Sequence, residues 1–214
     1  MKRSAFLVVV AGAAVTGFLA FKMNLAGPGT GYSTMTASAE SGSTAAYKKA
    51  MDAMMQNMKV SYAGDADIDF VRSMIPHHQG AIAMATVELE FGKDEDVVKL
   101  ATDIIKAQEG EIAILNEWLA NNVAPVTQLN PASTKAYETA MSSMMTNMMV
   151  AYTGDADTDL IKGMIPHHQG AIDMAKVVLE HGKDPEIRAL AESIVSAQER
   201  EIAFMKEWLV KKGN

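Results

Sequence analysis

Hydrophobic side chains recur every three or four residues through most of this chain, a spacing that is typical of amphipathic helices. No segment alternates with a period of two, so the pattern gives no indication of a β-sheet. Three helices are predicted in the first half, from about residue 45 to 62, from Asp65 or Asp67 to Gly92, and from Asp94 to just past Trp118. Aspartate favours the start of a helix and glycine its end, which supports these boundaries. The sequence therefore predicts an all-α protein.

The chain is a tandem duplication. A constant offset of 90 residues relates Tyr47 to Tyr137 and Trp118 to Trp208 without an insertion, and the segment MIPHHQGAI occurs at both 74–82 and 164–172. We divide the chain into an N-terminal segment, a first helical repeat, a linker and a second helical repeat, at residues 1–44, 45–122, 123–134 and 135–212. Short connections make neighbouring helices antiparallel, so we expect a helical bundle built from two three-helix repeats.

Both histidines of the repeated segment belong to the apolar face of the second helix. Helical spacing places His77 with Met74 and Ala81, while the opposite stripe contains Arg72, Pro76 and Gln79. Pro76 would bend or restart the helix on its solvent side, because proline has no backbone N–H. His167 and His168 occupy the same positions in the second repeat.

Methionines follow the inner face of the first helix. If this helix folds back onto the second about Gly64 and Asp65, Met51 is level with His78, and Met55 with Met74. The third helix similarly brings Gln108 opposite His78, with Glu111 within a turn. Each repeat is then expected to hold a metal site of histidines and methionines, hydrogen-bonded to a glutamine and a glutamate. The predicted ligands are His77, His78, Met51, Met54, Met55 and Met74 in the first repeat and His167, His168, Met141, Met144, Met145 and Met164 in the second, with Gln108, Glu111, Gln198 and Glu201 as their hydrogen-bonding neighbours.

Composition points to a soft metal ion. The chain has 17 methionines and no cysteine, so thioether is its one type of soft sulfur ligand. Imidazole combined with thioether suits Cu(I), and Ag(I) by the same chemistry, whereas Ca²⁺ and Mg²⁺ prefer oxygen ligands. The simpler interpretation is that methionine fills the core and that hydrogen bonds satisfy the histidines. Two adjacent buried imidazoles weaken that interpretation, because their desolvation is costly.

The N-terminus predicts export. Lys2 and Arg3 precede an apolar run over residues 5–21, which is typical of a signal peptide or of a retained membrane anchor. The one clean cleavage site, at residues 37–39, lies too far past this run for ordinary cleavage, which favours the anchor. We expect a periplasmic or extracellular protein. The net charge of −7 and the dispersed lysines argue against nucleic acid as a partner.

The repeated MIPHHQGAI segment, the GDAD sequence before it and the QExEIAxxxxWL ending resemble a bacterial family of exported ferritin-like helical proteins, and in particular its CopM-type copper-binding members. The resemblance covers roughly residues 44–212. It implies a four-helix-bundle core and the binding of copper, as Cu(I), for resistance or homeostasis. It also implies that His77, His78, His167 and His168 act with nearby methionines. A copper efflux or chaperone protein is a candidate partner.

Three functions remain open at this point. The first is a copper buffer or carrier that is not an enzyme. The second is a ferritin-like di-metal oxidase, which is disfavoured because the chain has no Glu-x-x-His and because Glu111 and Glu201 are the one seam carboxylate of each repeat. The third is a structural or partner-docking bundle whose buried histidines respond to pH.

Overall fold

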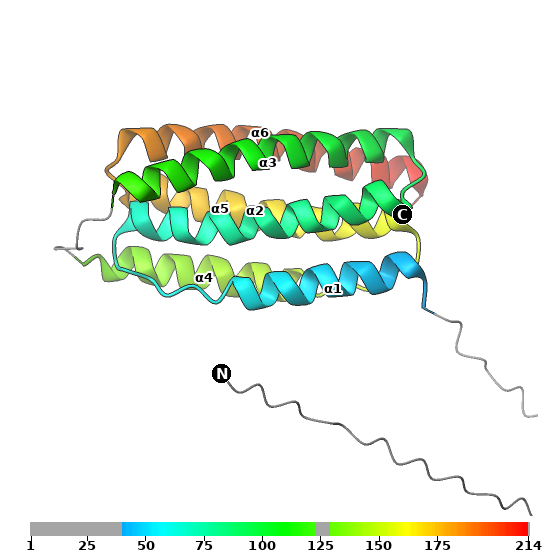
Figure 1. Cartoon of the computed structure of the whole chain (residues 1–214), viewed down its shortest axis with the longest axis horizontal. Coiled ribbons are helices and arrows are strands. Elements are labelled where there is room, and N and C mark those ends of the chain that lie inside the picture. Colours follow the sequence, from blue (N-terminus) through cyan, green and yellow to red (C-terminus); the bar gives the residue numbers. More distant parts are fainter. Residues whose placement is uncertain (1–39, 123–128, 214) are drawn as a thin grey trace, which may run out of the picture. The chain divides into compact units, whose positions relative to one another are not determined.

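The computed structural model describes residues 40–122 and 129–213, which form six helices and, within these ranges, no strand. The all-α prediction is confirmed. The predicted signal or anchor at 5–21 lies outside the described residues, as does 123–128 of the predicted linker. The helices are α1 (Gly42–Asn57), α2 (Ala66–Phe91), α3 (Glu95–Asn121), α4 (Pro131–Asn147), α5 (Ala156–His181) and α6 (Pro185–Lys212) (Figure 1). None of these six helices combines the length and apolar composition that crossing a bilayer requires.

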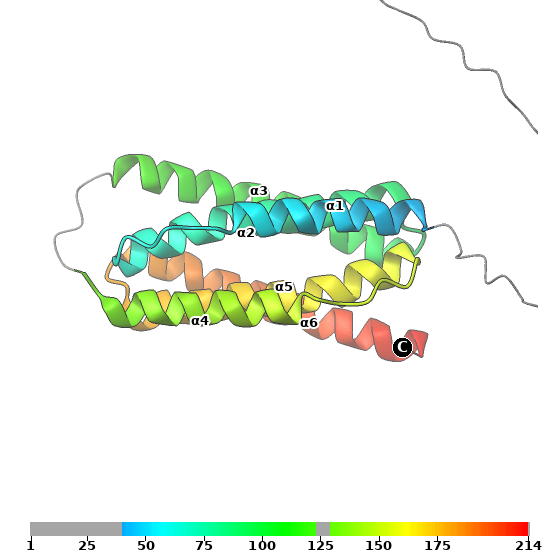
Figure 2. The same ribbon diagram turned by 90° about the horizontal axis from the view of Figure 1, so that it is seen from below.

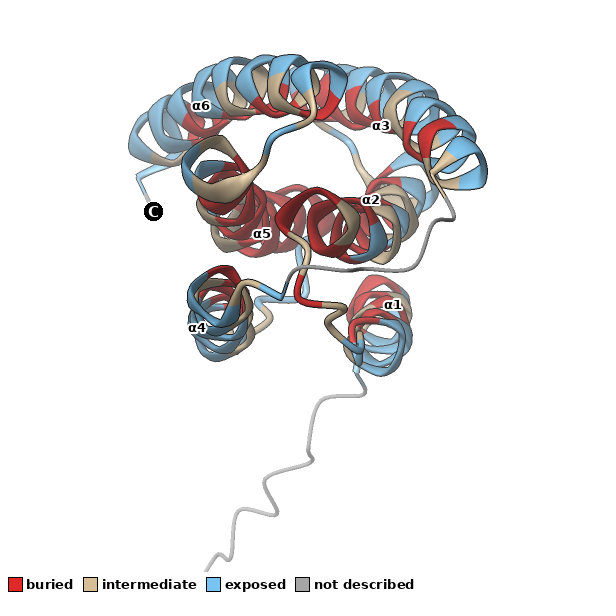
Figure 3. Cartoon of the chain, turned by 90° about the vertical axis from the view of Figure 1, so that its left-hand side faces the viewer, coloured by how far each residue is buried: buried red, intermediate tan, exposed pale blue. Residues whose placement is uncertain are grey.

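The six helices belong to one compact unit, Ala39–Asn214, and are arranged in three layers. Helices α2 and α5 form the middle layer, α3 and α6 cover one side of it, and α1 and α4 cover the other (Figures 2 and 3). Each helix of the middle layer contacts both other helices of its own repeat as well as its counterpart in the other repeat. The buried residues of α2 and α5 consequently occupy the centre of the protein.

The second and third helices begin and end as predicted. Asp65 caps α2 by accepting hydrogen bonds from the N–H groups of Asp67 and Ile68, and Gly92 follows its last residue. Asp94 caps α3 in the same way. The predicted restart at Pro76 does not occur, because α2 continues as one helix from Ala66 to Phe91.

The first helix is shorter than predicted, and this changes its register. It ends at Asn57 rather than near 62, and residues 58–65 form a non-helical connection that includes Gly64 with a φ of +80°. Because this connection is non-helical over several residues, each residue of α1 lies beside a later residue of α2 than a tight turn would give. Tyr47 therefore contacts Glu88, and Met54 packs on Gly80. The expected pairing of Met51 with His78 and of Met55 with Met74 is wrong.

Two aspartates lock α2 and α5 in antiparallel order. Asp67, at the start of α2, accepts hydrogen bonds from the backbone N–H groups of Lys183 and Asp184 at 2.8 and 3.2 Å, where α6 begins. Asp157, at the start of α5, accepts equivalent bonds at 3.0 and 2.9 Å from Lys93 and Asp94. An aspartate of each repeat thus accepts hydrogen bonds from backbone N–H groups where the other repeat's third helix begins. These N–H groups would otherwise lack partners.

The hydrophobic core has two parts, and both repeats contribute to each. One part joins the second half of α2 to the first half of α5, with Met84 and Leu160 among its members. The other joins the first half of α2 to the second half of α5, and includes Phe70 and Val178. The repeats predicted at 45–122 and 135–212 therefore pack as one interlocked bundle, in which neither repeat has a core of its own.

Glu88 is a buried carboxyl that breaks the symmetry between the repeats. Its Oε2 lies 3.1 Å from the Tyr47 hydroxyl, which also lies 3.2 Å from the backbone oxygen of Ala156. Burial, and after it the neighbouring Asp157 carboxyl, raises the pKa of Glu88 to about 8. At neutral pH Glu88 is then protonated, and the single proton of the Tyr47 hydroxyl has two acceptors, Glu88 Oε2 and the backbone oxygen of Ala156. Valine stands at the equivalent position, 178, of the second repeat.

We expect Glu88 to make the metal-free protein less stable in alkali. The pKa is about 8 in the folded chain and near 4.5 in the unfolded chain, so the unfolded state loses the proton first and stability falls as the pH rises from 4.5 through 8. Tyr47 of α1 and Asp155 and Asp157 of α5 face this carboxyl and are unchanged in Glu88→Gln. The melting temperature should fall less between pH 5 and pH 9 in Glu88→Gln than in the wild type. Parallel curves for the two proteins would contradict this assignment.

Candidate metal centre

His77 and His167 meet at the contact between α2 and α5. Nε2 of each ring lies 3.1 Å from the backbone oxygen of the other histidine, and the ring centroids are 3.8 Å apart. A carbonyl oxygen can only accept, so Nε2 of each ring carries the proton and donates it. The two repeats, rather than each repeat separately, therefore form the centre of the histidine cluster.

His78 and His168 flank this pair and turn toward the third helices. His78 Nε2 approaches Oε2 of Glu111 to 2.7 Å, although the angle does not suit a hydrogen bond, and His168 Nε2 lies 2.5 Å from Oε2 of Glu201. The predicted proximity of these histidines to the glutamates is present. Gln108 and Gln198 are buried as well, but Oε1 of each has no partner within the described residues.

The Nδ1 atom of all four rings lacks a hydrogen-bond partner. Among the described residues, Nδ1 of His77, His78, His167 and His168 accepts no hydrogen bond, although the four side chains are fully buried. Burial, followed by the neighbouring histidines, holds the pKa of His77 and His167 well below its usual range. These two imidazoles are neutral at pH 7, and their Nδ1 lone pairs are available to a ligand. A buried polar atom without a partner is uncommon and calls for an explanation.

Met54 and Met144 pack directly against the helices that carry the histidines. Met54 lies against Gly80, one turn after His77, and a Cβ at position 80 would lie 2.6 Å from Met54 Cγ and 2.7 Å from its sulfur. Met144 lies against Gly170 with nearly the same distances. Glycine in the sequence HHQG therefore admits a thioether against the backbone of the histidine-bearing helix, a role that sequence alone did not indicate.

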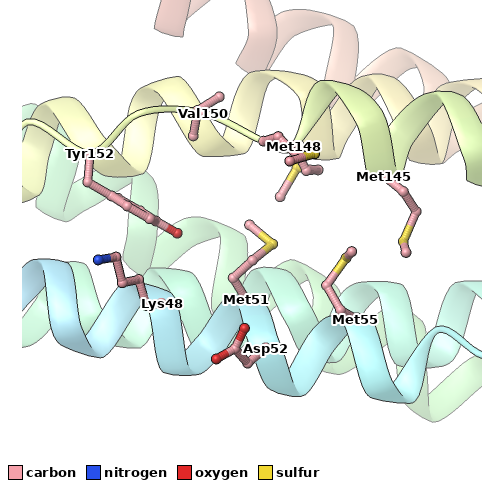
Figure 4. A pocket seen from close by; sticks show the side chains of 9 residues that line it. Lys48, Met51, Asp52, Met55, Met145, Met148, Val150 and Tyr152 are labelled. Carbon is pink, nitrogen blue, oxygen red and sulfur yellow. The ribbon is translucent and has the colours of Figure 1, made fainter.

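The structure separates the other predicted methionines from one another. Met74 and Met164 are fully buried one turn before the histidines, but they belong to different parts of the core. Met51, Met55 and Met145 are half-buried and line a groove between α1 and α4 (Figure 4). Met141 is half-buried beside both parts of the core.

The groove also contains residues that the sequence did not single out. Met148, Met149 and Tyr152 line it together with Lys48 and Asp52. The endings MQNM and MTNMM extend each methionine run past the predicted ligands, and the second ending contains Met148 and Met149. Met148 lies on the same sequence seam as Met141 and Met144 but is not among the predicted ligands; it is the C-cap residue of α4 and belongs to the core.

The arrangement limits which metals the protein could hold. No group of three or more histidine, aspartate or glutamate side chains within 40–122 and 129–213 has the arrangement of a metal site. A metal ion bound here would have to accept few nitrogen ligands or use thioether sulfur as well. Cu(I) and Ag(I) accept such ligands, whereas Zn²⁺ and Ca²⁺ want fuller sets of nitrogen, thiolate or oxygen ligands.

The sequence matches one described protein family over most of its length. A family described as a domain of unknown function, DUF305, matches residues 20–119 and again residues 67–209. The chain belongs to the DUF305 family. A curated relative, an uncharacterized protein of Acanthamoeba polyphaga mimivirus, is 43% identical over 53 residues, which make up 25% of this chain and 35% of the relative. The chain thus spans about a third of the length of that curated relative.

Solved structures of DUF305 proteins resemble this chain over most of their own length. CopM in its Cu(I)-bound form is 32% identical with a TM-score of 0.54, and the match covers 69% of this chain and 98% of CopM. CopM in an Ag-bound form is 32% identical with a TM-score of 0.52, covering 68% and 95%. A DUF305 protein from Streptomyces coelicolor, described as secreted, is 29% identical with a TM-score of 0.56, covering 71% and 96%.

The contact between Met54 and Gly80 can be tested by adding one methyl group. Gly80→Ala should lower the free energy of unfolding by about 1–3 kcal/mol, because the new Cβ overlaps a buried side chain. Gly110→Ala is the matched control, since Gly110 is also inside a helix but has nothing within 4 Å of an added Cβ. That variant should gain about 0.5–1 kcal/mol. Urea unfolding of the two variants measures both effects.

A double variant identifies the source of the loss. Adding Met54→Ala to Gly80→Ala should cost less than the sum of the two single changes, because the shortened side chain no longer overlaps the Cβ. Additive losses would show that Gly80 is required for another reason.

Proposed function

We propose that this protein is an exported copper-binding protein that holds Cu(I), and Ag(I) by the same chemistry, in metal resistance or homeostasis. The observation that carries the proposal is the buried layer of four imidazoles whose Nδ1 atoms have no partner in the described structure. A soft monovalent ion can use such nitrogen lone pairs without requiring a charged ligand. Binding an ion would compensate part of the desolvation cost of these rings.

Relatives support the same chemistry. CopM, a family member of similar fold, has been solved in Cu(I)-bound, Cu(II)-bound and Ag-bound forms. The MIPHHQGAI segments at 74–82 and 164–172 supply this chain with four imidazoles at the centre of the bundle. Methionine keeps its affinity for Cu(I) in an oxidising compartment, since thioether needs no deprotonation and forms no disulfide. This suits a protein carried out of the cytoplasm.

A role as buffer or carrier fits the surroundings of the imidazoles better than catalysis does. Glu111 and Glu201 are the carboxylates nearest the histidines, and each already faces one imidazole. A di-metal oxidase would need several more carboxylates directed at the same point. We therefore propose binding and exchange without turnover, with a copper efflux or chaperone protein as the class of partner that delivers or receives the ion.

Competition with a chromogenic Cu(I) chelator tests this function. The full-length chain should withdraw Cu(I) from the chelator, and the double variant His78→Gln with His168→Gln should have a lower Cu(I) capacity or bind at least about tenfold more weakly, a loss of ~1.4 kcal/mol. Glutamine keeps an amide donor for Glu111 and Glu201 but removes the imidazole nitrogen. Gln79→Ala, which changes the exposed neighbour of His78, is the control and should bind as the wild type does. If the wild-type chain takes no Cu(I) from the chelator, the proposed function is wrong.

A further inference from the structure

A second group of soft ligands lines a groove between α1, the end of α4 and the connection that follows α4, and no histidine is among the lining residues. Five of the nine residues that line the groove between these helices are methionines, namely Met51, Met55, Met145, Met148 and Met149. Figure 4 shows Met51 and Met55 extending from α1 toward α4, while Met145 and Met148 extend from the opposite wall. The first repeat supplies one wall of the groove and the second repeat supplies the other.

The burial of these methionines is unusual for side chains that only fill a core. Met51, Met55 and Met145 are half-buried, and Met149 is 84% exposed. Methionine gains little by facing water, and leucine would pack a plain helix interface with fewer conformers. The inward methionines Met54 and Met144 already fill the space against α2 and α5. Of the groove methionines, Met148 is 3% exposed and also belongs to the core, whereas Met51, Met55 and Met145 pack only against the edge of the core and leave part of each side chain facing the groove.

The remaining lining residues do not suit a hard metal ion. Asp52 is the one carboxylate among the residues that line the groove, and Lys48 places a positive charge at its rim. Zn²⁺, Ca²⁺ and Mg²⁺ need more oxygen or nitrogen ligands than Asp52 and the Tyr152 hydroxyl can supply. Several thioethers without a thiolate or an imidazole favour Cu(I) and Ag(I) instead.

We infer that the groove between α1 and α4 is a separate thioether site for a monovalent soft ion, formed jointly by Met51 and Met55 of the first repeat and Met145 and Met148 of the second. This inference rests on the proposed copper function and extends it. The groove is open to solvent at Met149, whereas the imidazole layer is fully buried. The protein would accordingly take up an ion at the groove without first opening its core.

Silver provides the direct test, because Ag(I) is diamagnetic and does not change oxidation state. The full-length chain, labelled with 13C in the methionine methyl groups, is titrated with silver nitrate in chloride-free buffer and followed by NMR. The methyl signals of Met51, Met55, Met145 and Met148 should shift together, whereas those of Met84 and Met174, buried on α2 and α5, should stay in place. This measurement uses the unaltered protein and does not depend on whether a variant folds.

Two variants separate the groove from the imidazoles. In the His78→Gln, His168→Gln protein the groove methyl signals should still shift with Ag(I). Replacing the four groove methionines by leucine keeps their volume and should lower the Ag(I) capacity measured by calorimetry, whereas Met84→Leu with Met174→Leu should leave it unchanged.

The outcomes distinguish the two proposals. If Ag(I) binds the wild-type chain but the groove methyl signals do not move, the groove inference is overturned and the copper function stands. If the groove methyl signals shift with Ag(I) in the wild-type chain but no longer shift when the histidines are replaced, the groove is not a separate site. That result also overturns the inference. If neither Ag(I) nor Cu(I) binds the wild-type chain, both proposals fall.

Discussion

The antiparallel contact between α2 and α5 determines the rest of this structure. His77 and His167 each donate to the other's backbone oxygen at its centre, while Asp67 and Asp157 fix its two ends by accepting from backbone N–H groups just before α6 and α3 of the opposite repeat. Polar groups thus hold the register where apolar packing alone would tolerate sliding, because each buried donor requires its acceptor. All four histidines reach one layer as a consequence, between two apolar regions.

This contact explains why the duplication matters. A single repeat would leave Nε2 of His77 without an acceptor and the backbone N–H groups of Lys93 and Asp94, just before α3, without Asp157. Tyr47 and Tyr137 show the same dependence, since each hydroxyl donates to the backbone of the opposite repeat, at Ala156 and Ala66. The two repeats resemble the halves of a symmetric dimer joined in one chain. The second repeat has valine at position 178, where the first repeat has Glu88. The symmetry is therefore incomplete, and one end of the bundle carries a titratable group.

Sequence periodicity predicted the bounds of the helices better than the contacts between them. The aspartate caps and the apolar seams fixed the bounds of α2 and α3, and a simple fold-back brought His78 to Glu111. Both inferences use residues that are near in sequence or joined by a short turn. The register of α1 failed because residues 58–65 do not form a tight turn. The meeting of His77 with His167 was not predictable in this way, since a repeat pattern is the same whether two halves stay apart or interlock.

The residues of the GDAD and HHQG sequences have different structural roles. In the first, Asp65 caps its own helix, Asp67 accepts from backbone N–H groups just before α6 of the other repeat, and Asp69 accepts from the backbone N–H groups of Ala63 and Gly64 in the preceding connection. In the second, the histidines form the buried imidazole layer and glycine admits Met54 or Met144 beside it. Because α1 and α4 present Met54 and Met144 to the helices that carry the histidines, and Met51, Met55 and Met145 to the groove, each of these two helices has thioether on two of its faces. The spacing of the methionine run, rather than its length, therefore decides which sulfur atoms face the core and which line the groove.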